Sequence, residues 1–165
     1  MNVLVIYDSA FGNTKKIAQA IEEAVEKHDQ GKLMTVDDTS LNELRSADLI
    51  LVGSPTQGGN PTQKMRQFLE GLPDDALQGK LVAAFDTRFD VRVQKLFLRL
   101  LMKLIGYASP RISTRLLAKG GALAADPVGF IVQDKAGPLK PGEIKRATIW
   151  VDDLLEVAHD GALPA

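Results

Sequence analysis

The residues best suited to chemistry lie near the start of the chain, in the turn that follows its first apolar segment. Ser9, Gly12, Asn13 and Thr14 come directly after the apolar run Val3–Tyr7 and directly before a segment with helical periodicity. A turn between a strand and a helix aims free backbone N–H groups, at the positive end of the helix dipole, toward one point, and hydroxyl groups join them here. The turn therefore predicts a binding site for a phosphate group, and hence a phosphorylated ligand.

This turn differs from two common glycine-rich phosphate loops. It lacks the spaced glycines and the Gly-Lys-Ser/Thr ending of a P-loop, and its single glycine does not make the G-x-G-x-x-G turn of dinucleotide-binding domains. A site made of hydroxyls and backbone N–H groups, without an arginine fork, suits a terminal phosphate monoester. The alternative is a helix start in which serine and threonine serve only as capping residues.

Strand-like and helix-like segments alternate along the chain, and the last strand is split by an Asp-Pro break. We expect strands at Asn2–Tyr7, Leu33–Val36, Leu49–Val52, Leu81–Phe85 and, in two pieces, Ala122–Ala124 and Gly129–Val132. We expect helices at Asn13–His28, Thr62–Leu69, Val91–Ile105, Ser109–Ala118 and Glu143–Ala158. This pattern predicts an α/β fold, a doubly wound open sheet of five parallel strands with helices on both faces.

Composition narrows the function classes. The chain of 165 residues, 45% hydrophobic and 25% charged, suits a single globular domain, which we expect at 1–160 with a C-terminal tail at 161–165. The absence of cysteine excludes disulfides, thiolate metal sites and cysteine nucleophiles, and with only two histidines we expect no metal site. We find neither a signal peptide nor an apolar run long enough to span a bilayer, and we expect a cytoplasmic protein.

Charge is distributed unevenly along the chain. Eight basic residues and one acidic residue lie between Thr87 and Lys119, although the net charge of the chain is −1. Helical spacing puts four of these basic residues on one face: Arg92, Lys95, Arg99 and Lys103. This face would contact an anionic membrane surface or an acidic partner, or would simply be solvated. The sequence pI of about 6.1 and the absence of interleaved aromatic residues give no support for nucleic-acid binding.

Two more segments follow the ends of predicted strands. Gly53–Pro61 holds three glycines and two prolines, and Asp86–Phe89 follows the next strand. In open α/β sheets, ligands bind beyond the carboxyl ends of the strands, where the strand order reverses. We therefore expect both segments to lie beside the phosphate turn.

The three segments together resemble the flavin-binding loops of the flavodoxin family. Tyr7–Ala18 is similar to the FMN phosphate loop, and Gly53–Pro61, followed by Met65 and Phe68-Leu69, is similar to the second flavin loop. Phe85–Phe89 stands where the third loop is expected, and Gly137–Glu143 resembles a closing segment of the less acidic members. The resemblance covers essentially the whole chain. It implies noncovalent FMN binding and a parallel sheet with strand order 2-1-3-4-5.

The resemblance also implies which residues would contact FMN. The phosphate would be held by Ser9, Ala10, Phe11, Gly12, Asn13 and Thr14. One side of the isoalloxazine ring would be lined by Pro55, Thr56, Gln57, Gly58, Gly59 and Asn60. The pyrimidine side would be reached by Asp86, Thr87, Arg88 and Phe89.

Two departures from the family pattern concern the flavin itself. Gln57 stands where carrier flavodoxins usually place an aromatic residue, so that Phe89 or Phe11 would have to supply ring stacking. A cation at Arg88 would make the reduction potential less negative than in an acidic carrier; the alternative is a surface arginine paired with Asp90. Gly58-Gly59 would either reorient to offer a carbonyl to the reduced flavin or form a plain tight turn.

The sequence therefore favours an electron carrier that exchanges electrons with partner proteins or a small-molecule acceptor. No acid, base or nucleophile stands out as catalytic. Two alternatives remain open: an FMN-dependent NAD(P)H or quinone oxidoreductase, and a flavin-free binding module on the same fold.

Overall fold

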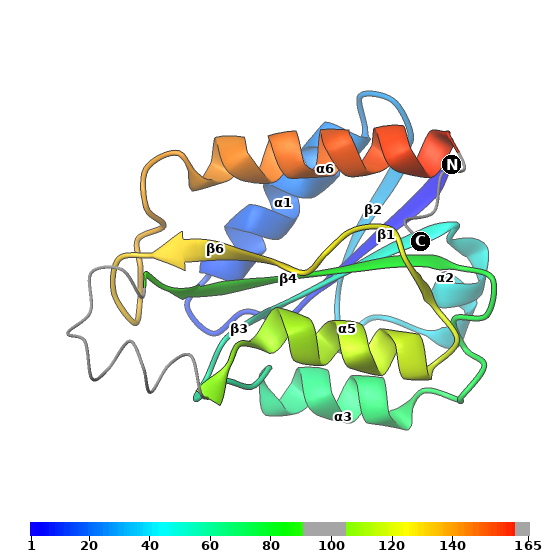
Figure 1. Ribbon diagram of the computed structural model, residues 1–165, viewed down its shortest axis with the longest axis horizontal. Coiled ribbons are helices and arrows are strands. Elements are labelled where there is room, and N and C mark those ends of the chain that lie inside the picture. The colour runs from blue at the N-terminus through cyan, green and yellow to red at the C-terminus, as the bar shows by residue number, and fades with distance from the viewer. Residues whose placement is uncertain (91–104, 161–165) are drawn as a thin grey trace.

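The strands pair in the predicted order. The computed structural model describes residues 1–90 and 105–160, and its six-stranded sheet has the order β2-β1-β3-β4-β5, with β6 also paired to β4 (Figure 1). All the pairs are parallel. The strands are β1 (Asn2–Tyr7), β2 (Gln30–Thr35), β3 (Leu49–Pro55), β4 (Leu81–Phe89), β5 (Ala122–Leu123) and β6 (Val128–Val132).

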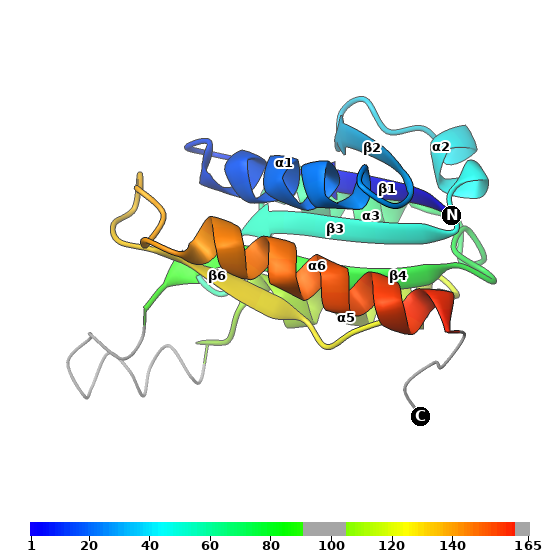
Figure 2. The same ribbon diagram turned by 90° about the horizontal axis from the view of Figure 1, so that it is seen from above.

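Helices cover both faces of this sheet. In Figures 1 and 2, α1 and α6 lie side by side on one face, while α3 and α5 lie on the other. The buried Leu44 of α2 packs into the same core as α3 and α5. The described helices are α1 (Asn13–Val25), α2 (Leu41–Ser46), α3 (Gln63–Gly71), α5 (Ala108–Ala118) and α6 (Glu143–His159).

Two separate cores follow from the alternation of side chains along each strand. Val3, Val5 and Tyr7 of β1 pack under α1 and α6, whereas Leu4 and Ile6 pack on the opposite face. Continuous apolar runs such as β3 are therefore buried on both sides, as expected for a parallel sheet. The doubly wound fold predicted from the sequence is confirmed.

The predicted split of the last strand is also correct. β5 pairs with the start of β4 through Leu81↔Ala122, and β6 pairs with its end through Phe85↔Val128. The break between them lets two short segments share one edge of β4. Both pieces of the split strand therefore lie beside a single neighbour.

The structure corrects several predicted boundaries. The segment Asp86–Phe89, expected to be a loop, is the last part of strand β4. α1 ends at Val25 rather than His28, and β2 begins at Gln30 rather than Leu33. α2 was not predicted from the sequence; it begins after Ser40, whose hydroxyl accepts a hydrogen bond from the Glu43 amide at 3.4 Å.

Part of the prediction falls outside the described residues. The expected helix at Val91–Ile105 lies almost wholly in 91–104, and with it lies the basic face that carries Arg92, Lys95, Arg99 and Lys103; the expected tail is 161–165. Within 1–90 and 105–160, none of the helices has the length and apolar composition that a bilayer crossing needs.

The neighbouring strands β3 and β4 approach closely at Gly53. A Cβ atom at this position would lie 2.1 Å from the ring of Phe85. Phe85 is fully buried and meets the rings of Phe130 and Trp150 edge to face, with centroids 6.3 and 6.2 Å away. Glycine at the end of β3 therefore makes room for the aromatic cluster beneath the carboxyl ends of the strands.

Candidate functional site

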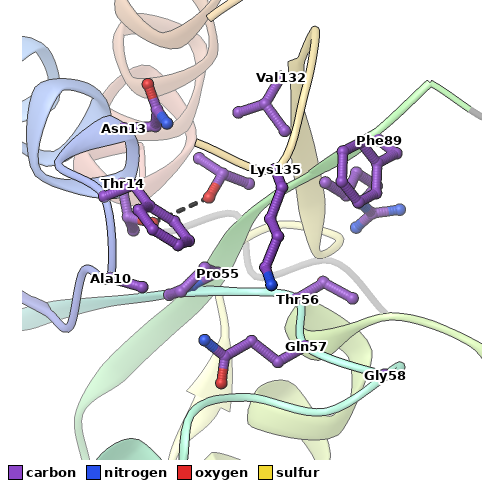
Figure 3. Close-up of a pocket in the computed structure, with 13 residues that line it drawn as sticks. Ala10, Asn13, Thr14, Pro55, Thr56, Gln57, Gly58, Phe89, Val132 and Lys135 are labelled. Atoms are coloured by element: carbon purple, nitrogen blue, oxygen red, sulfur yellow. Dashed lines mark hydrogen bonds between the residues drawn. The ribbon is translucent and has the colours of Figure 1, made fainter. Parts of the chain in front are cut away.

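The carboxyl ends of β1, β3, β4 and β6 meet at one edge of the sheet, on the left in Figure 1, and a cavity of about 410 Å³ opens there (Figure 3). Its surface is mainly apolar. The residues that line it are Ala10, Phe11, Asn13, Thr14, Pro55, Thr56, Gln57, Gly58, Thr87, Arg88, Phe89, Val132 and Lys135. All three segments singled out in the sequence therefore contribute to one cavity.

The turn Ser9–Thr14, which joins β1 to α1, has unused backbone donors beside the cavity. In the described part of the chain, the N–H groups of Ala10, Phe11, Asn13 and Thr14 make no hydrogen bond. Gly12 caps α1 with a φ of +83°, and the first turn of the helix contains no acidic residue. Among the described residues, the one carboxylate bonded to this turn, that of Asp8, accepts from the Ser9 amide at 2.9 Å and leaves the other four N–H groups free. Free N–H groups at a helix start are suited to an anion.

The Ser9 hydroxyl has a structural role in this turn. It accepts hydrogen bonds from the amides of Gly12 at 3.0 Å and Lys15 at 3.3 Å, and Ser9 does not line the cavity. The capping interpretation thus describes its side chain, whereas the backbone of the turn keeps its free donors. The side chain of Ser9 shapes the turn.

Two side chains of the first turn fix α1 to its neighbours. The hydroxyls of Thr14 and Thr87 lie 2.8 Å apart, the contact drawn in Figure 3, and join α1 to β4. The Asn13 amide donates to the carbonyl of Ala136 at 3.1 Å. The loop after β6 passes so close that a Cβ atom on Gly137 would lie 2.6 Å from the Asn13 amide oxygen. These contacts set the width of the cavity near the free N–H groups.

The second segment forms one wall and then turns away. Pro55, Thr56, Gln57 and Gly58 line the cavity, but Gly59 and Asn60 do not. The amides of Gln57 and Asn60 donate to each other's carbonyls at 2.8 and 3.0 Å, and the two glycines between them have φ values of +55° and +79°. Positive φ at both central residues defines the tight turn that glycine pairs favour, as the simpler of the two sequence interpretations expected.

The third segment behaves differently from its prediction. Thr87, Arg88 and Phe89 line the cavity, but Asp86 is 0% exposed and does not. The Arg88 guanidinium holds the Asp86 carboxylate with two hydrogen bonds, Nε to Oδ1 at 2.6 Å and Nη2 to Oδ2 at 2.7 Å. Because this ion pair balances the charge of Arg88, the guanidinium brings no unmatched positive charge to the cavity.

Arg88 is further fixed by the start of α5. It donates to the Ser109 hydroxyl at 2.9 Å and stacks over the Tyr107 ring at 3.8 Å from the centroid, while the Ser109 amide donates to Asp86 at 2.8 Å. Burial raises the pKa of the Tyr107 hydroxyl, with the positive charge of Arg88 acting in the opposite direction. The alternative pairing of Arg88 with Asp90 is wrong, since the Arg88 guanidinium pairs with Asp86, whereas Asp90 accepts from Lys140 at 3.1 Å.

Aromatic side chains reach the cavity from the first and third segments. Phe11, in the turn before α1, lines the cavity although it is 54% exposed. Phe89, at the end of β4, also lines the cavity and is half-buried. Gln57 keeps a polar side chain in the second segment. The stacking surface that Gln57 lacks is thus available from Phe11 and Phe89.

Sequence reasoning missed Val132 and Lys135. They lie at the end of β6 and in the loop behind it, and the Lys135 side chain crosses the cavity toward Thr56 (Figure 3). In the described residues the Lys135 ammonium has no ion-pair partner. The rule that ligands bind beyond the carboxyl ends of strands, applied to the predicted strand Gly129–Val132, could have found both residues.

Glu143, at the start of α6, fixes the end of β6, from which the Lys135 loop begins. Its carboxylate accepts hydrogen bonds from the Ile131 amide at 2.6 Å and from the Arg146 guanidinium at 2.5 Å. Burial acts to raise the pKa of Glu143, but the hydrogen bonds from Arg146 and Ile131 outweigh it and leave the pKa below its usual value. The ionised carboxylate therefore joins β6 to the first turn of α6.

Comparison with known proteins shows to which family this sequence belongs. The model of the family described as flavodoxin matches residues 5–96, more than half of the chain. A flavodoxin from Aquifex aeolicus is 36% identical over 90 residues, covering 52% of this chain and 49% of that protein. An NAD(P)H dehydrogenase (quinone) from Solidesulfovibrio magneticus is 32% identical over 108 residues, covering 50% and 53% respectively. The chain thus spans about half the length of these curated relatives.

Solved structures extend the similarity to the complete fold. The structure of a flavodoxin from the domain Archaea matches with a TM-score of 0.73 and 24% identity, covering 96% of this chain and 99% of that one. Flavodoxin-family proteins bind FMN, the cofactor that the resemblance of the sequence to this family implies. By its family match, and in agreement with its strand order, this chain belongs to the flavodoxin family.

Proposed function

We propose that this protein binds FMN noncovalently in the 410 Å³ cavity and acts as an electron carrier. The observation that carries the proposal is the combination, in one cavity, of free backbone N–H groups at the start of α1 and an apolar wall with aromatic side chains. Flavin mononucleotide has the matching parts, a phosphate monoester and a large planar ring. When bound, it supplies the reversible uptake of electrons that no side chain provides.

The chain's own residues would divide the binding task. The N–H groups of Ala10, Phe11, Asn13 and Thr14 would hold the phosphate, and the hydroxyl pair Thr14–Thr87 would keep that end of the cavity in shape. The walls Pro55–Gly58 and Thr87–Phe89 would enclose the ring and exclude water from one side of it. Ser9, Gly12, Gly59, Asn60 and Asp86 would act indirectly, by fixing the backbone or the side chains of these walls.

A carrier fits the lining better than an enzyme. The ionisable side chains among the described residues of the lining are Arg88, which is bonded to Asp86, and Lys135. The described lining thus has no carboxylate or imidazole placed to exchange a proton with a substrate. We infer that the cavity exchanges electrons with a redox partner protein or a small-molecule acceptor.

The second candidate is an FMN-dependent NAD(P)H or quinone oxidoreductase. It is favoured by the relative named NAD(P)H dehydrogenase (quinone) and by the exposed Phe11 ring at the cavity, which a flat second substrate could contact. A flavin-free binding module is the third candidate, and Gln57 in place of an aromatic residue favours it.

One experiment separates the three candidates. The purified protein is mixed with excess FMN, passed through gel filtration, and its visible absorption spectrum is recorded. A flavin spectrum that elutes with the protein supports the proposal, and its absence supports the flavin-free module. The loaded protein is then given NADH or NADPH with a quinone. Sustained turnover would support the oxidoreductase, and its absence would support the carrier.

A further inference from the structure

A second cavity, of about 200 Å³, lies between α3 and α5, and its lining includes Asn60 and Pro61, which follow the segment Pro55–Gly58 in the chain. Three arginines and one glutamate line it, together with Leu69 and Pro61, which are both buried. The charged residues are Arg66 and Glu70 of α3 and Arg111 and Arg115 of α5. The cavity thus has an apolar base and a rim of positive charge.

The positive charges of this cavity are poorly balanced. Arg115 pairs with Glu70 at 3.3 Å, but the side chains are 55% and 53% exposed, so solvent screens the pair. Arg66 makes neither an ion pair nor a side-chain hydrogen bond within residues 1–90 and 105–160. Three guanidinium groups against one carboxylate leave two positive charges in excess.

A hydrogen bond within the protein orders the side chain of Arg111. Its Nη2 donates to the carbonyl of Ile105 at 2.9 Å, and Ile105 in turn packs against Gly59, where a Cβ atom would lie 2.3 Å from the Ile105 side chain. This hydrogen bond uses one of the five guanidinium donors and fixes the direction of the others. Part of the entropy cost of ordering Arg111 on a ligand is therefore met before binding.

We propose that the cavity between α3 and α5 binds a phosphate group of a small ligand. Guanidinium forks match the geometry of phosphate oxygens, and a phosphate monoester near pH 7 carries a charge of roughly −1.5 to −2, close to the excess of the site. The cavity is a recess of about 200 Å³, large enough for a phosphate group. The recess therefore favours a small ligand over the extended surface of an acidic protein.

The test is a calorimetric titration with inorganic pyrophosphate at low ionic strength. The protein is first saturated with FMN, so that the N–H groups at the start of α1 are occupied. The variant is Arg66→Gln, because Arg66 has no described partner and its loss leaves the fold intact. The matched control is Arg45→Gln, an exposed arginine of α2 that does not line the cavity.

Saturable binding that weakens roughly tenfold in Arg66→Gln and stays within twofold in Arg45→Gln supports the proposal. The double variant Arg66→Gln/Arg115→Gln is expected to bind more weakly still. Absence of saturable binding, or equal weakening by both single variants, would overturn it. Binding of a glutamate-rich peptide in place of pyrophosphate would also overturn it and point to an acidic protein partner.

This inference is independent of FMN binding. If the protein retains no flavin, pyrophosphate can also reach the donors at the start of α1, but that binding survives in Arg66→Gln. The part of the affinity that Arg66→Gln removes therefore reports the cavity between α3 and α5, whichever way the flavin experiment ends.

Discussion

The Arg88 guanidinium lies against the buried Asp86 carboxylate, with two hydrogen bonds of 2.6 and 2.7 Å. Both residues belong to β4, two positions apart, so their side chains leave the strand on the same face. The ion pair lies at the end of β4, and both of its members hydrogen-bond to Ser109, which fixes the start of α5 to this strand. Arg88 is thus a structural residue at the wall of the cavity in which we propose that FMN binds.

The first prediction concerns the loss of Arg88. Arg88→Ala leaves the fully buried Asp86 carboxylate without its ion-pair partner, and we expect the free energy of unfolding to fall by about 3 kcal/mol. Urea denaturation measures this change. The matched control is Arg115→Ala, whose exposed pair with Glu70 should contribute less than about 1 kcal/mol. Equal effects of the two substitutions would contradict the assignment of a structural role.

The second prediction concerns the reduction potential. The sequence suggested Arg88 as the cation that raises it, but Asp86 balances that charge, whereas Lys135 crosses the same cavity without a described ion-pair partner. Lys135→Gln should therefore lower the potential of the FMN-loaded protein by an amount on the order of tens of millivolts, and less at high salt. A spectroscopic redox titration checks this. Lys145→Gln, on the exposed face of α6, is the control; equal shifts in the two variants would refute the role of Lys135.

The sheet could be predicted because its central strands are continuous apolar runs separated by helical periodicity. The end of β4 could not, because Asp86, Thr87 and Arg88 look like a polar loop in the sequence. Their polar groups are satisfied by one another and by Thr14 and Ser109, contacts that no local pattern reveals. α2 was missed because its six residues make too few turns for periodicity to show.

The candidate site was predicted at the level of segments but not of side chains. All three segments meet at one cavity, since the carboxyl ends of parallel strands share one edge. Within them, the sequence did not separate residues that face the cavity from residues that shape it, such as Ser9 and Asn60, because hydrogen bonds within a turn decide that difference.

The third prediction concerns acid stability. Hydrogen bonds from Arg146 and Ile131 keep the pKa of Glu143 below its ordinary value of 4.5 in the folded protein. The lowered pKa means that the ionised carboxylate adds stability above the unfolded pKa and that this stability is lost as pH falls below about 4.5. Glu143→Gln should reduce stability at pH 7 and flatten its decline in acid. Chemical denaturation across pH measures both, and Glu156→Gln on exposed α6 surface should change neither.

The fourth prediction concerns the contact of β3 with the aromatic cluster. A methyl group at Gly53 would collide with the Phe85 ring at 2.1 Å, so Gly53→Ala should lower the free energy of unfolding by roughly 1–3 kcal/mol through overpacking. Gly71→Ala is the control, because its Cβ would meet nothing within 4 Å. Thermal denaturation compares them, and a Gly53→Ala protein as stable as Gly71→Ala would show that Phe85 moves aside freely.

The last prediction concerns the exposed aromatic residue of the cavity. Phe11 lines the cavity while 54% of it stays in solvent, so its ring contributes little to the stability of the protein alone. If it stacks on bound FMN, Phe11→Ala should weaken FMN binding by roughly two- to twelvefold, as expected for an aromatic pair worth about 0.5–1.5 kcal/mol, and should leave the unfolding midpoint of the flavin-free protein unchanged. Quenching of FMN fluorescence measures the affinity. Ile149→Ala, at a similarly exposed apolar residue of α6, controls for nonspecific loss of surface. Unchanged affinity in Phe11→Ala would leave Phe89 as the described aromatic residue of the lining able to stack on the flavin.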